Sequence, residues 1–286
     1  MFCFVFSGIC TIFAHNIRNK VLMKSNYAVI SFIVLLFVLC SCSSDIESGK
    51  QIDFQKMERT KTVPIEKSPD APSCKIELAI HYAKGNDNRA ININNTIEKR
   101  LLDMCNLSME QAADSFINRY CNDYIKALAP LYGNDKNDKS KHSWYEYRYS
   151  ISTEIMQEND DYTAYIAILD LYEGGAHGIQ QTFAMNFDIK TGNLVKLTDI
   201  FVQGFERRLN DILFKALERK TGTKGILDLQ DKGYLCTTDI YPSDNFIMKE
   251  NSISFIYNVY EIAPYSQGMT ELEIPYSDIN DLLKKQ

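Results

Sequence analysis

The chain has 286 residues, 45% hydrophobic and 24% charged, which is the composition of one or two ordinary globular domains. Its net charge is −6, and because residues 1–41 hold three basic residues and no acid, residues 42–286 carry −9. Such acidity argues against nucleic acid as a partner, since phosphate binding needs a basic surface, and it either attracts cationic partners or serves solubility alone.

The N-terminal segment has the pattern of a bacterial lipoprotein signal. Residues 28–39 form an apolar run that is too short to cross a bilayer comfortably but suits a signal peptide. The run ends in Leu39-Cys40-Ser41-Cys42, which resembles a lipobox whose lipid-accepting residue is Cys42. We therefore expect residues 1–41 to be a signal peptide. The alternative is a short hydrophobic anchor with incidental cysteines.

Two further expectations concern this segment. Met23-Lys24 is a normal signal-peptide beginning, whereas residues 1–14 form a second apolar stretch that a signal peptide does not need, so we expect translation to start at Met23. Acyl chains on Cys42 would anchor the protein to a membrane. The expected location is the outer membrane or the cell surface, outside the cytoplasm, and both the periplasmic and the surface-exposed placement stay open.

Residues 42–73 are expected to comprise the lipidated cysteine and a flexible tether, because they are polar, of mixed charge and rich in proline. Four cysteines follow the leader, and an even number outside the cytoplasm permits two disulfides with three connectivities. Cys105 and Cys121 lie in neighbouring helical segments and form one candidate pair. The four residues are Cys74, Cys105, Cys121 and Cys236.

The folded part begins with an alternating segment, residues 75–82, which predicts a half-buried strand. Between residues 91 and 131 the apolar residues recur at helical spacing, and Ser108 is a candidate N-cap between two helices. These elements make up an N-terminal α+β module at residues 74–155.

Strands dominate the remainder, residues 156–286. Hairpins are expected between strands 145–156 and 162–172 and between strands 181–188 and 194–197, followed by a helix at 201–220. Segments 245–249, 252–257 and 272–274 predict three more strands, and Asp278 is expected to open a C-terminal helix. The predicted fold is α+β, with an antiparallel sheet, helices packed on one side and two adjoining α+β subdomains.

Three segments carry a family resemblance: residues 171–178 (LYEGGAHG), residues 187–201 (FDIKTGN to LTDIF) and residues 255–268 (FIYNVYEIAPYSQG), with Ile274-Pro275-Tyr276 behind them. Their order and spacing resemble the C-terminal domain shared by the anti-sigma factor RsiV and the peptidoglycan deacetylase PdaC, domain of unknown function 3298, over about residues 160–283. The 75–155 region resembles, more weakly, its PdaC-like companion module, domain of unknown function 4163.

The resemblance implies a binding module at the cell envelope of a bacterium. The lipoprotein features of the N-terminal segment favour a member of the Bacteroidetes as this bacterium. RsiV binds lysozyme directly, so it implies a lysozyme-like protein or peptidoglycan as the partner. Anti-sigma activity is not implied, because the cytoplasmic tail is missing, and deacetylase activity is not implied, because no His-x-x-x-His occurs. No cofactor or metal is expected. The alternatives are an uncharacterised cell-wall hydrolase and a purely structural lipoprotein.

The first candidate site is the glycine-rich turn, with Glu173, Gly174, Gly175, His177 and Gly178. The glycines allow positive φ and close backbone approach. Glu173 and His177 could act as a base or as metal ligands in a hydrolase, although one histidine and one glutamate do not make a metal set. The alternative, which we favour, is a tight turn whose histidine bonds the backbone.

The second candidate site is the loop that follows the strand at 252–257, with Tyr260, Glu261, Pro264 and Tyr265. Tyrosine and proline on a rigid loop suit protein contacts, since tyrosine brings a large area at little cost in entropy. We assign the contact role to Pro264 and Tyr265 in particular, and we expect the alternating residues of the preceding strand to be core.

Overall fold

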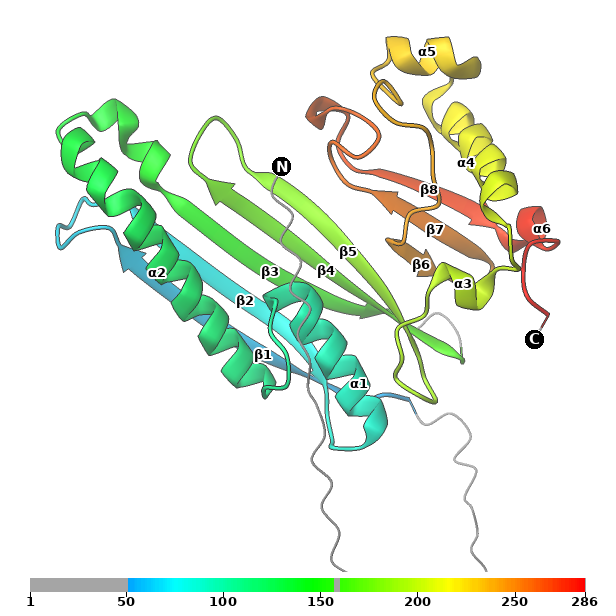
Figure 1. The fold of residues 1–286 in the computed structure, drawn as a ribbon, viewed down its shortest axis with the longest axis horizontal. Helices are drawn as coiled ribbons and strands as arrows, with labels where there is room; N and C mark the ends of the chain where they lie inside the picture. The colour runs from blue at the N-terminus through cyan, green and yellow to red at the C-terminus, as the bar shows by residue number, and fades with distance from the viewer. Residues whose placement is uncertain (1–50, 157–159, 286) are drawn as a thin grey trace, which may run out of the picture. The chain divides into compact units, whose positions relative to one another are not determined.

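Residues 51–156 and 160–285 are described by the computed structural model of the chain (Figure 1). They belong to one compact unit spanning residues 47–286. The expected signal peptide, the start at Met23 and the lipidated Cys42 lie outside the described residues. The elements, in chain order, are β1 (Phe54–Pro64), β2 (Ser73–Ala83), α1 (Asn88–Ile97), η1 (Glu98–Leu102), α2 (Met109–Asp135), η2 (Lys139–Tyr145), β3 (Tyr147–Met156), β4 (Tyr162–Glu173), β5 (Ile179–Asp188), α3 (Leu197–Ile200), α4 (Glu206–Thr221), α5 (Gly225–Asp231), β6 (Phe246–Met248), β7 (Ser252–Tyr257), η3 (Tyr265–Gln267), β8 (Thr270–Pro275) and α6 (Tyr276–Ile279).

The larger sheet contains five strands in the order β1-β2-β3-β4-β5. The α+β class is confirmed, but the sheet is mixed, because β2 and β3 pair in parallel while the other neighbours are antiparallel. Parallel neighbours need a long crossover, and α1 and α2 supply it. The expected boundary at residues 155 and 156 falls within the β3–β4 pairing, so strands on both sides of it share this sheet.

One face of this sheet is covered by α1 and α2, as Figure 1 shows. The alternating residues of β2 that point to the helices are fully buried or nearly so, with Ile76 and Ile80 at 0% exposure. The predicted N-cap is confirmed, because the Ser108 hydroxyl accepts a hydrogen bond from the Gln111 N–H and Gln111 returns one to Ser108. Such reciprocal capping fixes the start of a helix.

The predicted tether does not extend through residues 54–64, which form strand β1. Only Met57 of this strand is buried. Its long side chains reach the helices instead, since Arg59 bonds Asp114 at 3.2 Å and Lys61 bonds Asn118 at 2.9 Å. An edge strand needs few apolar residues, and charges protect its free edge against pairing with other chains. The polar sequence therefore concealed a strand.

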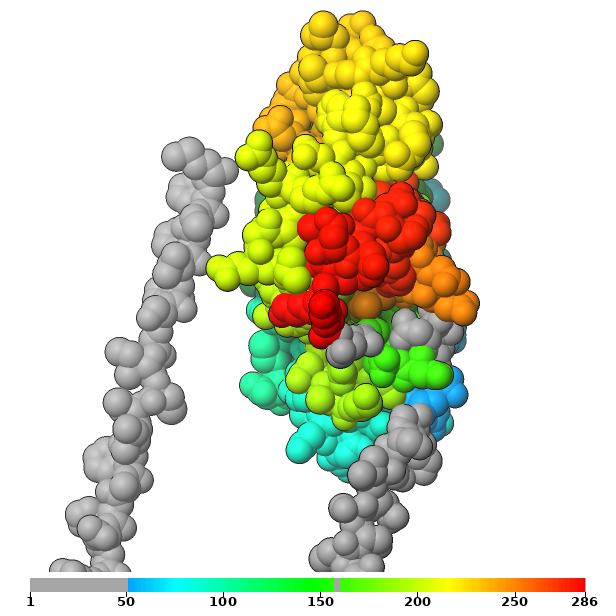
Figure 2. All heavy atoms as spheres, turned by 90° about the vertical axis from the view of Figure 1, so that its right-hand side faces the viewer, coloured from blue at the N-terminus to red at the C-terminus, as the bar shows by residue number. Residues whose placement is uncertain are grey.

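The smaller sheet is antiparallel, with the order β6-β7-β8. α4 packs against it around a second core that includes Phe255 and Leu272. Figure 2 shows α4 and α5 (yellow) and the C-terminal residues (red) on one face of the molecule. The expected hairpin at 181–197 is reduced to one bridge between Phe187 and Leu194. Among the described helices, none is both long and apolar enough to cross a membrane.

Three asparagines join the two sheets at the edge of β5. Asn245 and Asn258 accept hydrogen bonds from the backbone N–H groups of Thr182 and Ala184, at 2.6 Å for Asn245 to Ala184 and 2.7 Å for Asn258 to Thr182. Asn186 donates to the Phe246 carbonyl at 2.8 Å and accepts from the Met248 N–H at 2.9 Å. A small apolar layer of Ala164, Ala184, Ile247 and Ile256 lies beside them. We call these contacts the asparagine joint.

The four cysteines of the described chain are free thiols, so the expected disulfides are not formed in this structure. Cys105 and Cys236 are exposed, whereas Cys74 and Cys121 are buried in the larger core. The candidate pair Cys105–Cys121 thus joins a surface residue to a core residue. Burial, with Cys121 close by, raises the pKa of the Cys74 thiol to about 12. The core closes through apolar contacts without covalent cross-links.

Candidate functional site

The glycine-rich turn between β4 and β5 requires its glycines for two separate reasons. Gly174 and Gly175 have φ values of +77° and +92°, which disfavour any residue with a Cβ atom. A Cβ on Gly174 would overlap the carbonyl oxygen of Trp144, and one on Gly178 would lie 2.7 Å from the Leu171 carbonyl oxygen. The turn therefore packs tightly against η2 and against its own strand, as the glycine spacing predicted.

The second predicted site, the loop between β7 and β8, is fixed by hydrogen bonds and by packing against neighbouring segments. Tyr260 adopts a φ of +71°, and its N–H donates to the Ala263 carbonyl at 3.0 Å. Glu261 accepts from the Tyr241 hydroxyl at 3.3 Å, which makes it a positioning residue. Pro264 packs on Gly233, where an added Cβ would come within 3.2 Å of the proline ring. Tyrosine at positive φ is strained, and such strain concentrates at functional sites.

These two predicted sites meet in space. The rings of His177 and Tyr265 stack with centroids 4.2 Å apart and planes inclined by 19°. Tyr260 lies beside them, 5.9 Å from the Tyr265 ring. Tyr260 is 59% exposed and Tyr265 is 39% exposed, so the group presents aromatic surface to solvent. We call His177, Tyr260 and Tyr265 the aromatic cluster. The His177 Nδ1 lies 3.2 Å from the Gly178 carbonyl oxygen, so this side chain bonds the backbone of its own turn.

Glu173, by contrast, faces the helices. Its carboxylate accepts a 2.6 Å hydrogen bond from the Tyr120 hydroxyl of α2. Burial and this bond raise the pKa of Tyr120 well above its usual range. Successive residues of a strand point to opposite faces, so Glu173 and its neighbour Tyr172 lie on different sides of the sheet. The structure thus separates Glu173 from the aromatic cluster.

A groove of about 320 Å³ adjoins the aromatic cluster on the face of the larger sheet that the helices leave open. We call it the sheet groove; it is lined by Lys75, Glu77, Arg148, Tyr149, Ser150, Asp170, Leu171, Tyr172, Gly178, Ile179, Gln180 and Tyr265. Several of its polar side chains contact one another. Lys75 pairs with Glu77 at 2.9 Å, Gln180 donates to Asp170 at 2.8 Å, and the Arg148 guanidinium lies 4.8 Å from the centre of the Tyr172 ring.

Sequence reasoning missed the floor of this groove. Its side chains are the polar positions of alternating strands, such as Glu77, Arg148 and Asp170, which the pattern marks only as exposed. An arginine and two acidic residues at exposed positions of the predicted strands were the only feature that could have indicated this groove. Their grouping depends on which strands pair, and the parallel pairing of β2 with β3 was not predicted.

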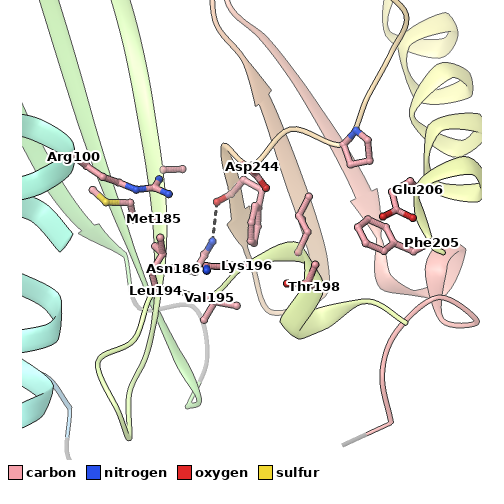
Figure 3. Close-up of a pocket in the computed structure, with 14 residues that line it drawn as sticks. Arg100, Met185, Asn186, Leu194, Val195, Lys196, Thr198, Phe205, Glu206 and Asp244 are labelled. Carbon is pink, nitrogen blue, oxygen red and sulfur yellow. Dashed lines mark hydrogen bonds between the residues drawn. The ribbon is translucent and has the colours of Figure 1, made fainter. Parts of the chain in front are cut away.

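A second hollow, of about 400 Å³, lies where β5 approaches the smaller sheet (Figure 3). We call it the β5 pocket; it is lined by Arg100, Ala184, Met185, Asn186, Leu194, Val195, Lys196, Leu197, Thr198, Phe205, Glu206, Pro242, Asp244 and Phe246. The Asn186 amide of the asparagine joint forms part of its wall through its bond to Phe246. Sequence reasoning predicted none of these residues as a site.

Within residues 51–156 and 160–285, no group of three or more histidine, cysteine, aspartate or glutamate side chains is arranged to hold a metal ion. Glu173 and His177, the metal ligands weighed above, are engaged by Tyr120 and by Tyr265 with the Gly178 backbone. The aromatic cluster and the sheet groove adjoin each other and share Tyr265.

The fold and these surfaces define an α+β protein of two sheets with hollows beside their junction. Residues 198–277 match a family described as "Protein of unknown function (DUF3298)". This match lies within the region of the predicted resemblance. The predicted companion module at 75–155 and the closer tie to RsiV and PdaC stay predictions.

The solved structures that resemble the chain include two DUF3298 proteins. A DUF3298 family member from Bacteroides fragilis superimposes with a TM-score of 0.77 at 28% identity, over 83% of this chain and 96% of that one. A DUF3298 family protein from Pseudomonas aeruginosa gives a TM-score of 0.58 at 17% identity, over 82% of this chain and 96% of that one, which shows likeness of fold alone. No match is found among curated proteins.

Proposed function

We propose that this protein is a binding module of the cell envelope whose partner is a cationic protein of the lysozyme type. The observation that carries the proposal is the convergence of the glycine-rich turn and the β7–β8 loop into one exposed aromatic cluster. Rigid aromatic side chains at the centre of a contact surface supply much of the binding energy in protein complexes. The strained φ of Tyr260 and the tight turn hold these rings in place before a partner arrives.

Charge supports the same partner. Residues 42–286 carry −9, and the calculated isoelectric point of the chain is about 5.4. Glu173 and Glu261 are satisfied by tyrosine hydroxyls, yet their charges still add to the field at this end of the sheet. An acidic surface accelerates the approach of a cationic protein, and salt weakens this effect.

Titration of the protein with lysozyme, at low and at moderate salt, tests the proposal. We expect saturable binding that weakens with salt and falls by about tenfold or more in Tyr265→Ala, the loss typical of a central aromatic contact. Leu227→Ala on α5 is the matched control, because Leu227 is 73% exposed and lies outside the aromatic cluster. Absence of binding at micromolar concentrations, or equal losses in the two variants, would refute the proposal.

Peptidoglycan is the second candidate partner, favoured by the polar floor and the tyrosine wall of the sheet groove. Sugar rings pack on aromatic faces while their hydroxyls bond charged side chains, and Arg148 and Asp170 offer such groups. Soluble peptidoglycan fragments in the same titration, with Asp170→Asn as the variant, separate the two partners. A hydrolase built on Glu173 and His177 is less well supported, since the two side chains bond different neighbours on different elements.

The proposal includes a lipid anchor at Cys42 and a location outside the cytoplasm. Its support is the lipobox-like Leu39-Cys40-Ser41-Cys42 after an apolar run. Metabolic labelling with a fatty acid tests it: label should enter the wild-type protein and be absent from Cys42→Ser. Label that persists in Cys42→Ser would refute the anchor without touching the proposed partner.

A further inference from the structure

The β5 pocket gathers four charged side chains of both signs from four separate parts of the chain. Arg100 comes from η1, Lys196 precedes α3, Glu206 opens α4 and Asp244 precedes β6. Figure 3 shows Arg100 and Glu206 entering from opposite sides. Within the described part of the chain, none of the four forms an ion pair. This contrasts with the sheet groove, where Lys75 and Glu77 pair directly.

The pocket is also lined by apolar side chains. Phe205 and Phe246, which are 5% and 2% exposed, line it together with Leu194, Val195 and Leu197, and Figure 3 shows Phe205 beside Glu206. Opposite charges that share a hollow without pairing are held apart by the framework that carries them. A ligand that contacts charges of both signs and the apolar lining would itself carry both charges and an apolar part.

The placement of Arg100 has a specific structural cause. Helix α1 continues as a π-helix over Glu98–Leu102, a rare conformation that is frequent at functional sites. Glu98 and Leu102, at the two ends of this turn, are buried at 1% and 0% exposure. With both ends anchored in the core, Arg100 at the middle of the turn projects toward β5, as Figure 3 shows.

We propose that the β5 pocket binds a short zwitterionic peptide. Its carboxylate lies against Arg100 and Lys196, its ammonium group against Asp244 and Glu206, and its apolar side chains against the two phenylalanines. The volume of about 400 Å³ lies within the range that small ligands occupy in proteins. This inference stands independently of the partner proposed for the aromatic cluster, because the two hollows share no lining residue.

Calorimetric titration of the protein with the tripeptide Ala-Leu-Ala tests this inference. The N-acetylated and the C-amidated forms of the same peptide serve as probes that lack one charge each. We expect the unblocked peptide to bind at least about tenfold more tightly than either blocked form, the loss typical of removing one charged contact.

Variants assign the two ends. Arg100→Gln should weaken the unblocked peptide by about tenfold and leave the amidated one unchanged, because that peptide has no carboxylate to lose. Asp244→Asn should likewise weaken the unblocked peptide by about tenfold and leave the acetylated one unchanged, because the acetylated peptide has no ammonium group to lose. Arg219→Gln, an exposed cation of α4 outside the β5 pocket, is the matched control and should change nothing.

Three outcomes would overturn the proposal. One is the lack of saturable heat up to about 10 mM peptide, since weaker binding falls below that of a specific site. Another is equal binding of the blocked and unblocked peptides. The third is an equal effect of Arg100→Gln and Arg219→Gln, which would show that only the overall charge matters. Arg100 and Asp244 are both exposed, so their variants should fold, and circular dichroism verifies this.

Discussion

The strands within each sheet and the two sheets themselves are joined in different ways. Within the larger sheet, continuous backbone ladders join neighbouring strands, with up to eleven residue pairs between β1 and β2. Between the sheets, β5 meets the smaller one through the side-chain amides of Asn186, Asn245 and Asn258. A ladder tolerates many sequences, whereas an amide contact fixes one geometry. The junction is therefore the more specific of the two and the easier to disrupt.

Both hollows depend on this junction. The β5 pocket takes Asn186 from the larger sheet and Phe246 from the smaller, and the sheet groove takes Tyr265 from the loop after β7. A shift between the sheets would change both hollows together. The asparagine joint thus supports the sites as much as the fold.

The largest expected effect comes from the two cores. Phe187 of the larger sheet and Phe255 of the smaller are both fully buried, so Phe187→Ala and Phe255→Ala should each lower the unfolding free energy by about 3–5 kcal/mol. If the joint couples the sheets, each variant unfolds in urea in a single transition. Fluorescence of Trp144, the only tryptophan, reports the end of the larger sheet, and circular dichroism reports the whole. Two separate transitions in Phe255→Ala would show that the sheets unfold independently.

The joint itself should give the next largest effect. Asn186→Ala leaves the Phe246 carbonyl and the Met248 N–H without their partner in a buried place, which costs about 2–4 kcal/mol. Gln180→Ala on the same strand is the control, because Gln180 is exposed and its loss should change stability by less than about 0.5 kcal/mol. Urea denaturation measures both. Similar costs for the two would refute a special role for the joint.

Alkaline pH should lower the unfolding free energy through tyrosines beside both cores, and over the same pH range for each. Burial raises the pKa of Tyr149 on β3 and of Tyr276 beside the second core to about 12 each. The folded state then holds protons that the unfolded state releases above about pH 10, so stability is retained below that pH and lost as the pH rises toward 12. Urea unfolding at increasing pH should show this decline. Tyr149→Phe and Tyr276→Phe should each flatten it, and an unchanged slope in both would contradict the assignment.

The smallest effect concerns the strained residue of the aromatic cluster. Glycine adopts a φ of +71° without steric strain, whereas alanine, like tyrosine, has a Cβ atom and is strained there. Tyr260→Gly should therefore be about 1 kcal/mol more stable than Tyr260→Ala in thermal unfolding. Both variants lack the ring, so they should lose partner binding equally. A more stable alanine variant would mean that the loop relaxes out of this conformation.

Much of the local structure could be predicted from the sequence. The alternation at 75–82 predicted β2, helical spacing predicted the α1 and α2 region, and Ser108 caps α2 as expected. The glycine-rich turn and the β7–β8 loop were both singled out as candidate sites. Local patterns carry these features, because spacing and turn chemistry act within a few residues.

What could not be predicted depends on contacts between distant residues. The stacking of His177 on Tyr265 and the π-helix that carries Arg100 follow from how the sheets pack. β1 was not predicted because its sequence is largely charged and polar, and an edge strand buries few apolar side chains. Asparagine is uncommon in strands, so Asn186 within β5 indicates an unusual environment. The residue alone does not identify the strand that its side chain bonds.

The parallel pairing of β2 with β3 has a consequence for the order in which the chain folds. The β1–β2 hairpin and the β3–β4–β5 meander each join neighbours in sequence, whereas residues 84–146, with the helices, separate β2 from β3. Closing so long a loop is entropically costly, and such contacts dominate folding rates. We expect two local nuclei to form early and to dock late. Until they dock, β2 and β3 both expose an unpaired edge, and the chain is most open to aggregation at that stage.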